Sequence, residues 1–306
     1  MLRITFLGTG GSLPTRNRNP SAVMVNREGE LILFDCGEGT QQQMMRAKTG
    51  MMNLSSIFVS HFHADHFLGI PGLIQTMSFM GRKEPLLIYG PEGTREFTEL
   101  FKALGYFNLK YEVQGIQLNP GDVVEREEYV IRALKTEHSI SSLGYALVEN
   151  PRPGRFNREK AIELGIPPGP LFSKLQKGKT VEVNGKLVKP EDVMGKNLRP
   201  GRTVVYSGDT RPCEPILEAS RDADVLIHDG SFADEMADWA EESKHSTAGE
   251  VAALAKEAGV RKLILTHISS RYTDDAEPLL IDSKKIFEDV IIAEDLMEIE
   301  VPYRSK

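Results

Sequence analysis

The feature that most constrains this chain is a dense group of metal-binding residue types, His61-Phe62-His63-Ala64-Asp65-His66. It follows an apolar run that ends near Ser60, where we predict that a strand turns into a helix. An extended backbone points His61 and His63 to the same side, and Asp65 and His66 follow in the turn. Imidazole and carboxylate together suit zinc and similar divalent ions. Because packing alone rarely gathers three His and one Asp within six residues, we predict a metal site here.

Three further candidate ligands lie where predicted strands end. His138 ends the run 129–136, Asp209 follows the run 203–206, and His267 follows the run 261–266. In open α/β sheets the loops at strand ends are where site residues gather. The HxHxDH group has too few ligands for two ions, so these residues are candidates for the remainder.

Short apolar runs rich in β-branched residues alternate with longer helical patterns, which favours an α/β fold with two sheets and covering helices. In the first half we predict strands near 2–7, 21–26, 30–35, 56–60, 85–90, 107–118, 129–136 and 143–149, and helices near 38–48, 65–80 and 92–104. In the second half we predict strands at 203–206, 224–228 and 261–266 with a final pair, and helices near 213–220, 248–258 and 283–289. Helix 248–258 has clear boundaries, because Thr247 and Glu250 can form a capping box and Gly259 follows its last turn.

Charge is segregated along the chain. The net charge is −7, but residues 151–202 contain twelve basic and five acidic residues, which gives this segment +7 and the remainder −14. Prolines, glycines and sparse apolar residues at about 151–200 indicate an arm inserted into a single domain of residues 1–306. A segregated basic segment suggests a polyanionic partner, although a solvated lysine-rich insertion would explain it as well.

The N-terminus and the cysteines bear on the compartment. The apolar part of residues 1–7 is too short for a signal peptide, and no apolar run approaches the roughly 18–20 residues of a membrane span. Cys36 and Cys213 are the only two cysteines and lie far apart in the sequence, so no disulfide framework is implied. These features predict a cytoplasmic protein without a membrane partner.

Several motifs carry a resemblance to a known family. The order of the motifs resembles that of the metallo-β-lactamase superfamily: HxHxDH comes first, followed by a lone His, a Gly-Asp and a His at a strand end. Four further segments point to one family within this superfamily. They are Gly8-Thr9-Gly10-Gly11-Ser12, Phe34-Asp35-Cys36-Gly37-Glu38-Gly39-Thr40-Gln41, Ser207-Gly208-Asp209-Thr210-Arg211-Pro212 and Lys244-His245-Ser246-Thr247-Ala248. Together these segments look like ribonuclease Z, the family of endonucleases that remove 3′ trailers from precursor tRNA. The resemblance covers nearly the whole chain and implies an αββα sandwich of two mixed sheets with outer helices.

The resemblance also implies roles for individual residues. It implies two Zn²⁺ ions per subunit, one held by His61, His63, His138 and Asp209, and the other by Asp65, His66, Asp209 and His267. Asp65 is then the expected proton acceptor, and His245 is expected to stabilise the developing charge or protonate the leaving oxygen. The helix that starts near Ala248 is expected to offer free backbone N–H groups to a phosphate.

The implied reaction is hydrolysis of one phosphodiester by a two-metal site, leaving a 3′-hydroxyl on the tRNA and a 5′-phosphate on the trailer. Lys174, Lys177 and Lys179 resemble part of an exosite that grips the tRNA through its phosphates. Members of this family are usually homodimers, and the resemblance implies no nucleotide cofactor.

Two positions near the motifs allow more than one interpretation. Asp35 is expected to orient a ligand histidine, or else to be an ordinary turn aspartate. The segment His228-Asp229-Gly230-Ser231-Phe232 departs from the family's usual His-Glu-Ala-Thr-Phe. Because aspartate is shorter than glutamate, the substitution leaves any contact by Asp229 in doubt.

Two other functions stay open on the sequence alone. A small-substrate phosphodiesterase or arylsulfatase-like hydrolase of the same superfamily would keep the metals and need no basic arm. A non-catalytic RNA-binding protein on a degenerate hydrolase fold would keep the arm, but its intact ligand set argues against this alternative.

Overall fold

A computed structural model describes residues 1–105, 107–195 and 197–304. The chain folds into two compact units. The first, called the body, holds Met1–Val148 and Arg202–Tyr303, and the second, called the arm, holds Glu149–Gly201 and, close to the C-terminus, Arg304. Within the described residues, the body contains two seven-stranded sheets, and no helix anywhere is long and apolar enough to cross a membrane.

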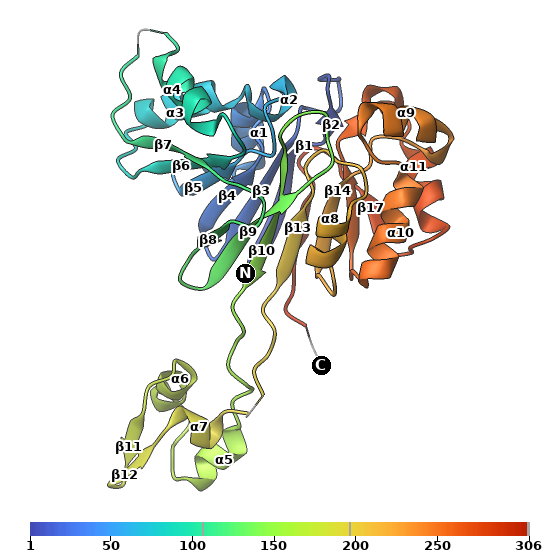
Figure 1. The fold of residues 1–306 in the computed structure, drawn as a ribbon. Helices are drawn as coiled ribbons and strands as arrows, with labels where there is room; N and C mark the ends of the chain where they lie inside the picture. The colour runs from blue at the N-terminus through green and yellow to red at the C-terminus, as the bar shows by residue number, and fades with distance from the viewer. Residues whose placement is uncertain (106, 196, 305–306) are drawn as a thin grey trace. The chain divides into compact units, whose positions relative to one another are not determined.

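The first sheet is built mainly from the N-terminal half of the chain (Figure 1). Its order is β18 (Glu298–Glu300), β1 (Leu2–Gly8), β3 (Ala22–Arg27), β4 (Glu30–Phe34), β5 (Leu54–Phe58), β6 (Leu86–Gly90) and β7 (Val113–Gln117). The pairs from β18 to β4 are antiparallel, and those from β4 to β7 are parallel. The carboxyl ends of the parallel strands meet at one edge, the edge to which the HxHxDH group belongs.

The second sheet is built mainly from the C-terminal half. Its order is β17 (Val290–Ile292), β15 (Leu263–Thr266), β14 (Val225–Asp229), β13 (Thr203–Tyr206), β10 (Leu143–Glu149), β9 (Tyr129–Lys135) and β8 (Val123–Glu125). Strands β13, β14, β15 and β17 pair in parallel, while β10 is antiparallel to β13. A small parallel pair, β2 (Gly10–Gly11) and β16 (Ile268–Ser269), joins segments from the two halves.

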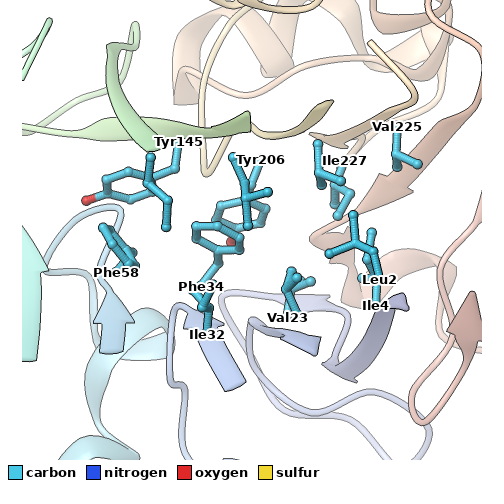
Figure 2. Packing of buried hydrophobic residues seen from close by; sticks show 14 of the residues in the cluster. Leu2, Ile4, Val23, Ile32, Phe34, Phe58, Tyr145, Tyr206, Val225 and Ile227 are labelled. Carbon is cyan, nitrogen blue, oxygen red and sulfur yellow. The ribbon is translucent and has the colours of Figure 1, made fainter. Parts of the chain in front are cut away.

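The two sheets bury a shared apolar core (Figure 2). Phe34 of β4 is fully buried and stacks on Tyr206 of β13, with ring centroids 5.4 Å apart. Ile4, Val23 and Ile227 continue the same cluster. Burying each large apolar side chain contributes roughly 1.5–3 kcal/mol, so this interface holds the two sheets face to face.

Helices cover the outer face of each sheet through separate apolar clusters. On the first sheet these are α1 (Thr40–Ala47), α3 (Ile70–Phe79) and α4 (Thr94–Ala103). On the second they are α8 (Glu214–Ala219), α10 (Ala248–Ala258) and α11 (Glu277–Lys284). The remaining helical turns of the body are α2 (Ala64–Phe67), η1 (Asp234–Met236), α9 (Ala237–Ser243) and η2 (Ser270–Tyr272). The predicted αββα arrangement is therefore confirmed.

Most predicted elements are present, and a few predictions were wrong. The capping box of α10 forms as expected, and Gly259 ends the helix at φ +68°. The single helix predicted for 65–80 is two helices separated at Leu68 and Gly69, and the strand predicted for 107–118 covers only 113–117. A Cβ at Gly69 would lie 2.2 Å from the carbonyl oxygen of Gly37, so this junction is a close backbone contact.

The helix predicted near 283–289 was also wrong, because the helix is Glu277–Lys284. Its start is set by Asp275, whose Oδ1 accepts a hydrogen bond from the backbone N of Glu277 at 2.8 Å. Ile286 and Phe287 do pack on the apolar cluster of the second sheet, as a helical pattern would suggest. They do so from a turn, in which both backbone N–H groups donate to the carbonyl of Ser283.

The arm has secondary structure and an apolar cluster of its own. Its elements are α5 (Arg158–Glu163), α6 (Pro170–Gln176), β11 (Val181–Val183), β12 (Lys186–Val188) and α7 (Pro190–Val193). Ala161, Ile166, Leu175 and Val181 are among the buried residues that hold these elements together. Its two ends pair through Arg152 and Arg199, whose backbone groups exchange hydrogen bonds of 2.7 and 2.8 Å.

Candidate metal centre and catalytic site

One group of candidate ligands forms around three of the predicted histidines. The ligand atoms of His61, His63, His138 and Asp209 all lie within 4.8 Å of one another. His61 Nε2 is 2.9 Å from His63 Nδ1, which is 3.2 Å from His138 Nε2. These side chains come from the ends of β5, β9 and β13, so the strand-end prediction brings together residues that are up to 148 positions apart.

A second group forms beside the first. Asp65, His66 and His267 also place their ligand atoms within 4.8 Å of one another. Asp209 Oδ2 lies 3.2 Å from His66 Nε2, 3.2 Å from His267 Nε2 and 3.6 Å from His61 Nε2. The Asp209 carboxylate therefore faces both groups, as a bridging ligand must.

The outer nitrogen of several imidazoles is fixed by hydrogen bonds, which decides the ligand atom. His66 Nδ1 lies 2.8 Å from Asp35 Oδ2, and His138 Nδ1 lies 3.1 Å from the carbonyl oxygen of Lys244. His267 Nδ1 lies 2.9 Å from Ser231 Oγ. With the proton on each of these three Nδ1 atoms, the Nε2 atoms of His66, His138 and His267 turn lone pairs into the site, which is an arrangement that metal-binding histidines use. His63 instead faces the first group with its Nδ1.

Two buried polar atoms at this site make no hydrogen bond among the described residues. His66 Nε2 and Asp209 Oδ1 are both buried and make no hydrogen bond there. Burial alone would raise the pKa of Asp209, but the charges of His267 and His66 hold that pKa well below its usual range. Ionised carboxylates among inward-facing imidazoles are a donor set for divalent cations, so the residues present fit the metal that the sequence implies.

Asp35 contacts the site directly and is more than an ordinary turn residue. It is fully buried and, besides its contact with His66, accepts a hydrogen bond from the Tyr206 hydroxyl at 2.6 Å. The Ser60 backbone N and Oγ also donate to it, at 2.6 and 2.8 Å. Asp35 therefore orients His66. A Cβ at the nearby Gly37 would lie 2.4 Å from the carbonyl oxygen of Asp65, so glycine lets this loop approach the HxHxDH turn.

His245 lies at the margin of the same site. Its ring centroid is 5.0 Å from that of His267 and 5.2 Å from that of His138. His245 Nδ1 lies 2.8 Å from Asp229 Oδ2. Burial lowers the pKa of His245, but the Asp229 carboxylate more than offsets this and raises it to about 9.

Asp229, whose contacts the sequence left in doubt, lies beside His245. Its Oδ2 faces His245, and its Oδ1 accepts hydrogen bonds from the backbone N and the hydroxyl of Ser231, at 3.0 and 2.7 Å. Ser231 in turn contacts His267. Aspartate is long enough here because β14 ends at this residue and brings its carboxylate directly beside His245. The signal for Asp229 in the sequence was its position in the segment His-Asp-Gly-Ser-Phe, which differs from the family's usual His-Glu-Ala-Thr-Phe.

The expectation of free N–H groups at the start of α10 was wrong. Ala248 N donates to the carbonyl of Phe232 at 2.9 Å, and Gly249 N donates to Asp234 Oδ1 at 2.8 Å. Glu250 N donates to Thr247 Oγ1. The capping interactions that define this helix start use the same donors that a phosphate would need.

The three predicted exosite lysines belong to the arm. Lys174 is on α6, and Lys177 and Lys179 follow its last turn; all three side chains are exposed. The buried side chain of Leu175 anchors the helix, and the backbone N of Lys179 donates to the carbonyl of Lys174 at 2.9 Å. The arm thus presents these charges from an ordered helical turn.

The two-sheet fold and the His/Asp site define a metal hydrolase of the metallo-β-lactamase type. Residues 171–268 match the family described as beta-lactamase superfamily domain, and residues 2–152 match the one described as anti-Pycsar protein Apyc1. The chain is 85% identical to ribonuclease Z of Methanosarcina acetivorans over 306 residues, all of both chains. It is 51% identical to ribonuclease Z of Archaeoglobus fulgidus over 304 residues, 99% of each chain. This chain belongs to the ribonuclease Z family.

A solved structure agrees with this assignment. The crystal structure of the short form of human tRNase Z superposes with a TM-score of 0.71 at 29% identity, covering 98% of this chain and 99% of the human one. The similarity therefore extends over the arm as well as the body.

Proposed function

We propose that this chain is a metal-dependent endoribonuclease that removes the 3′ trailer from precursor tRNA. The observation that carries the proposal is full-length similarity to ribonuclease Z together with a site that collects His61, His63, His138, Asp65, His66, Asp209 and His267. The imidazole-rich donor set favours zinc, and two groups sharing Asp209 favour two ions per subunit. The arm supports tRNA as substrate through its basic charge.

The metal ions would supply acidification of the attacking water and stabilisation of negative charge on the phosphate. Burial would raise the pKa of the Asp65 carboxyl, but the neighbouring His66 and His267 side chains hold that pKa far below its usual range. Its carboxylate is therefore available as a ligand and as a hydrogen-bond acceptor that would orient the attacking water. Asp209 faces both groups and would be the ligand that the two ions share.

We assign protonation of the leaving oxygen to His245. Asp229 keeps the imidazolium charged at neutral pH, and Nδ1 is used by that contact, so Nε2–H is the proton available to substrate. When the phosphorus–oxygen bond to the tRNA breaks, this proton goes to the 3′ oxygen. The products are a 3′-hydroxyl on the tRNA and a 5′-phosphate on the trailer.

Incubation with a 3′-extended precursor tRNA, followed by end-group analysis, tests this function. We expect a cut near the discriminator base that a chelator abolishes and zinc restores, with two zinc ions per subunit by elemental analysis. Hydrolysis of a small phosphodiester without cleavage of precursor tRNA would keep the metal site but reject the substrate.

Replacing Asp229 with asparagine is expected to lower kcat about tenfold or more near pH 8. His245 works as an acid only while protonated, so activity is lost as pH rises through its raised pKa. Without the Asp229 charge that pKa falls, and the alkaline limb of the kcat profile moves to lower pH. The profile should be measured at matched zinc content, because Ser231 links Asp229 to His267. Asp289→Asn, at an exposed carboxylate paired with Lys262, is the control. An unshifted alkaline limb would argue against this role.

We also propose that the enzyme is a homodimer and acts in the cytoplasm. Exposed apolar side chains at Phe79, Met80, Leu100 and Leu104, near the ends of α3 and α4, support a protein-facing surface. Both cysteines are free, as a reducing compartment requires. Light scattering should give twice the 34.1 kDa subunit mass; a monomer at micromolar concentration would contradict the dimer.

A further inference from the structure

Asp295 gathers hydrogen bonds from three separate segments of the body without touching the metal centre. Its Oδ1 accepts from the backbone N and the Oγ1 of Thr9, at 3.0 and 2.7 Å. Its Oδ2 accepts from the backbone N and Nδ2 of Asn19, both at 2.8 Å, and from Nε2 of Gln43 at 2.9 Å. Five donors thus use both oxygens of one carboxylate.

Thr9 connects this carboxylate to the strand that follows His267. Arg18 Nη1 donates to Thr9 Oγ1 at 2.8 Å, so the Thr9 hydroxyl is held from two sides. The Thr9 carbonyl accepts a hydrogen bond from the backbone N of Ile268 at 2.9 Å. Ile268 is the residue directly after His267, and it pairs with Gly10 in the small β2–β16 sheet.

The same loop reaches both proposed ligands of the second group. A Cβ at Gly11 would lie 2.6 Å from His267 Cε1, so the loop backbone packs against that imidazole. Ser12 has φ +59°, an uncommon conformation for a residue with a side chain, and its backbone N donates to Asp65 Oδ2 at 2.7 Å. Among the described residues, the hydrogen bonds of this loop do not reach His61, His63 or His138.

We propose that Asp295 is a positioning residue that, through the loop Thr9–Ser12, holds Asp65 and His267 in place for one of the two ions. The inference rests on the proposed function, which assigns an ion to Asp65, His66 and His267. It predicts an unequal effect: loosening the loop weakens the ion on this group and spares the ion on His61, His63 and His138.

Asp295→Asn is the direct test, because the amide puts an NH₂ group against donors that now face a carboxylate oxygen. Glu294→Gln is the matched control, since it removes the same charge from the neighbouring, exposed side chain. Thr9→Val is the milder second variant, which removes the hydroxyl and keeps the shape. The readouts are zinc per subunit after dialysis, zinc affinity by competition with a chromophoric chelator, and the melting temperature of the metal-free proteins.

We expect one zinc ion to bind Asp295→Asn about 10–100-fold more weakly and the other to keep its affinity. Loss of a residue that orients metal ligands typically weakens metal binding by about this factor. Thr9→Val should show the same asymmetry to a smaller extent, and Glu294→Gln should bind two ions like the wild type. Wild-type affinities in both test variants would overturn the inference. So would equal weakening of both ions with a lower melting temperature, which a general structural role would produce. A wild type that binds one ion would reject the site assignment itself, and the inference with it.

Discussion

Asp65→Ala is expected to reduce cleavage of precursor tRNA by about 10³-fold or more, while the Kd for tRNA changes less than about threefold. Asp65 Oδ2 lies 3.4 Å from His66 Nε2 and 3.3 Å from His267 Nε2, at the centre of the proposed second ion site. Its loss would remove a proposed ligand and the group proposed to orient the attacking water. The basic residues proposed to hold tRNA belong to the arm and are unchanged.

Single-turnover cleavage and equilibrium tRNA binding separate these effects, with zinc content measured on the same samples. Asp289→Ala, at an exposed carboxylate outside the site, controls for the loss of a negative charge. A parallel loss of cleavage and binding would contradict a chemical role for Asp65. Retained cleavage in a protein that still holds two ions would contradict it as well.

The core of the site could be predicted because its residues follow simple rules of placement. HxHxDH is contiguous, so its spacing carries the signal directly. His138, Asp209 and His267 are distant in sequence, but each follows a strand, and the ends of these strands meet in the fold. Asp229, Ser231 and Asp295 could not be identified in this way, because their roles depend on which loop lies across from each of them.

The fold was predictable where periodicity and boundary signals agreed. Helix α10 has a capping box at one end and Gly259 at the other, and both were visible in the sequence. The wrong boundaries arose where tertiary contacts override local pattern. Gly69 breaks a helical run because Gly37 approaches it, and Ile286 and Phe287 reach the core from a turn. Tertiary contacts also explain why the first N–H groups of α10 are not free. Their acceptors on Phe232 and Asp234 belong to another segment of the chain.

Removing the arm is expected to raise the KM for precursor tRNA about tenfold or more and leave hydrolysis of a small phosphodiester unchanged. The backbone pair between Arg152 and Arg199 provides a clean junction, so residues 153–198 can be replaced by an Asn-Gly turn. The apolar clusters of the body include no residue from 153–198, and the body should therefore remain folded.

A smaller change identifies the part that charge plays. Replacing Lys174, Lys177 and Lys179 together by alanine should weaken tRNA binding. It should also reduce the magnitude of the negative slope of log K against log salt concentration by roughly 2 to 3, since each phosphate contact contributes about 0.7–0.9. The matched control replaces Lys83, Lys256 and Lys284, three exposed lysines of the body, by alanine. A general effect of net charge would weaken binding equally in both triple variants, whereas a specific surface makes the arm variant alone lose affinity. If the arm deletion left tRNA affinity unchanged, the body alone would have to supply the contacts, and the arm would be a solvated insertion.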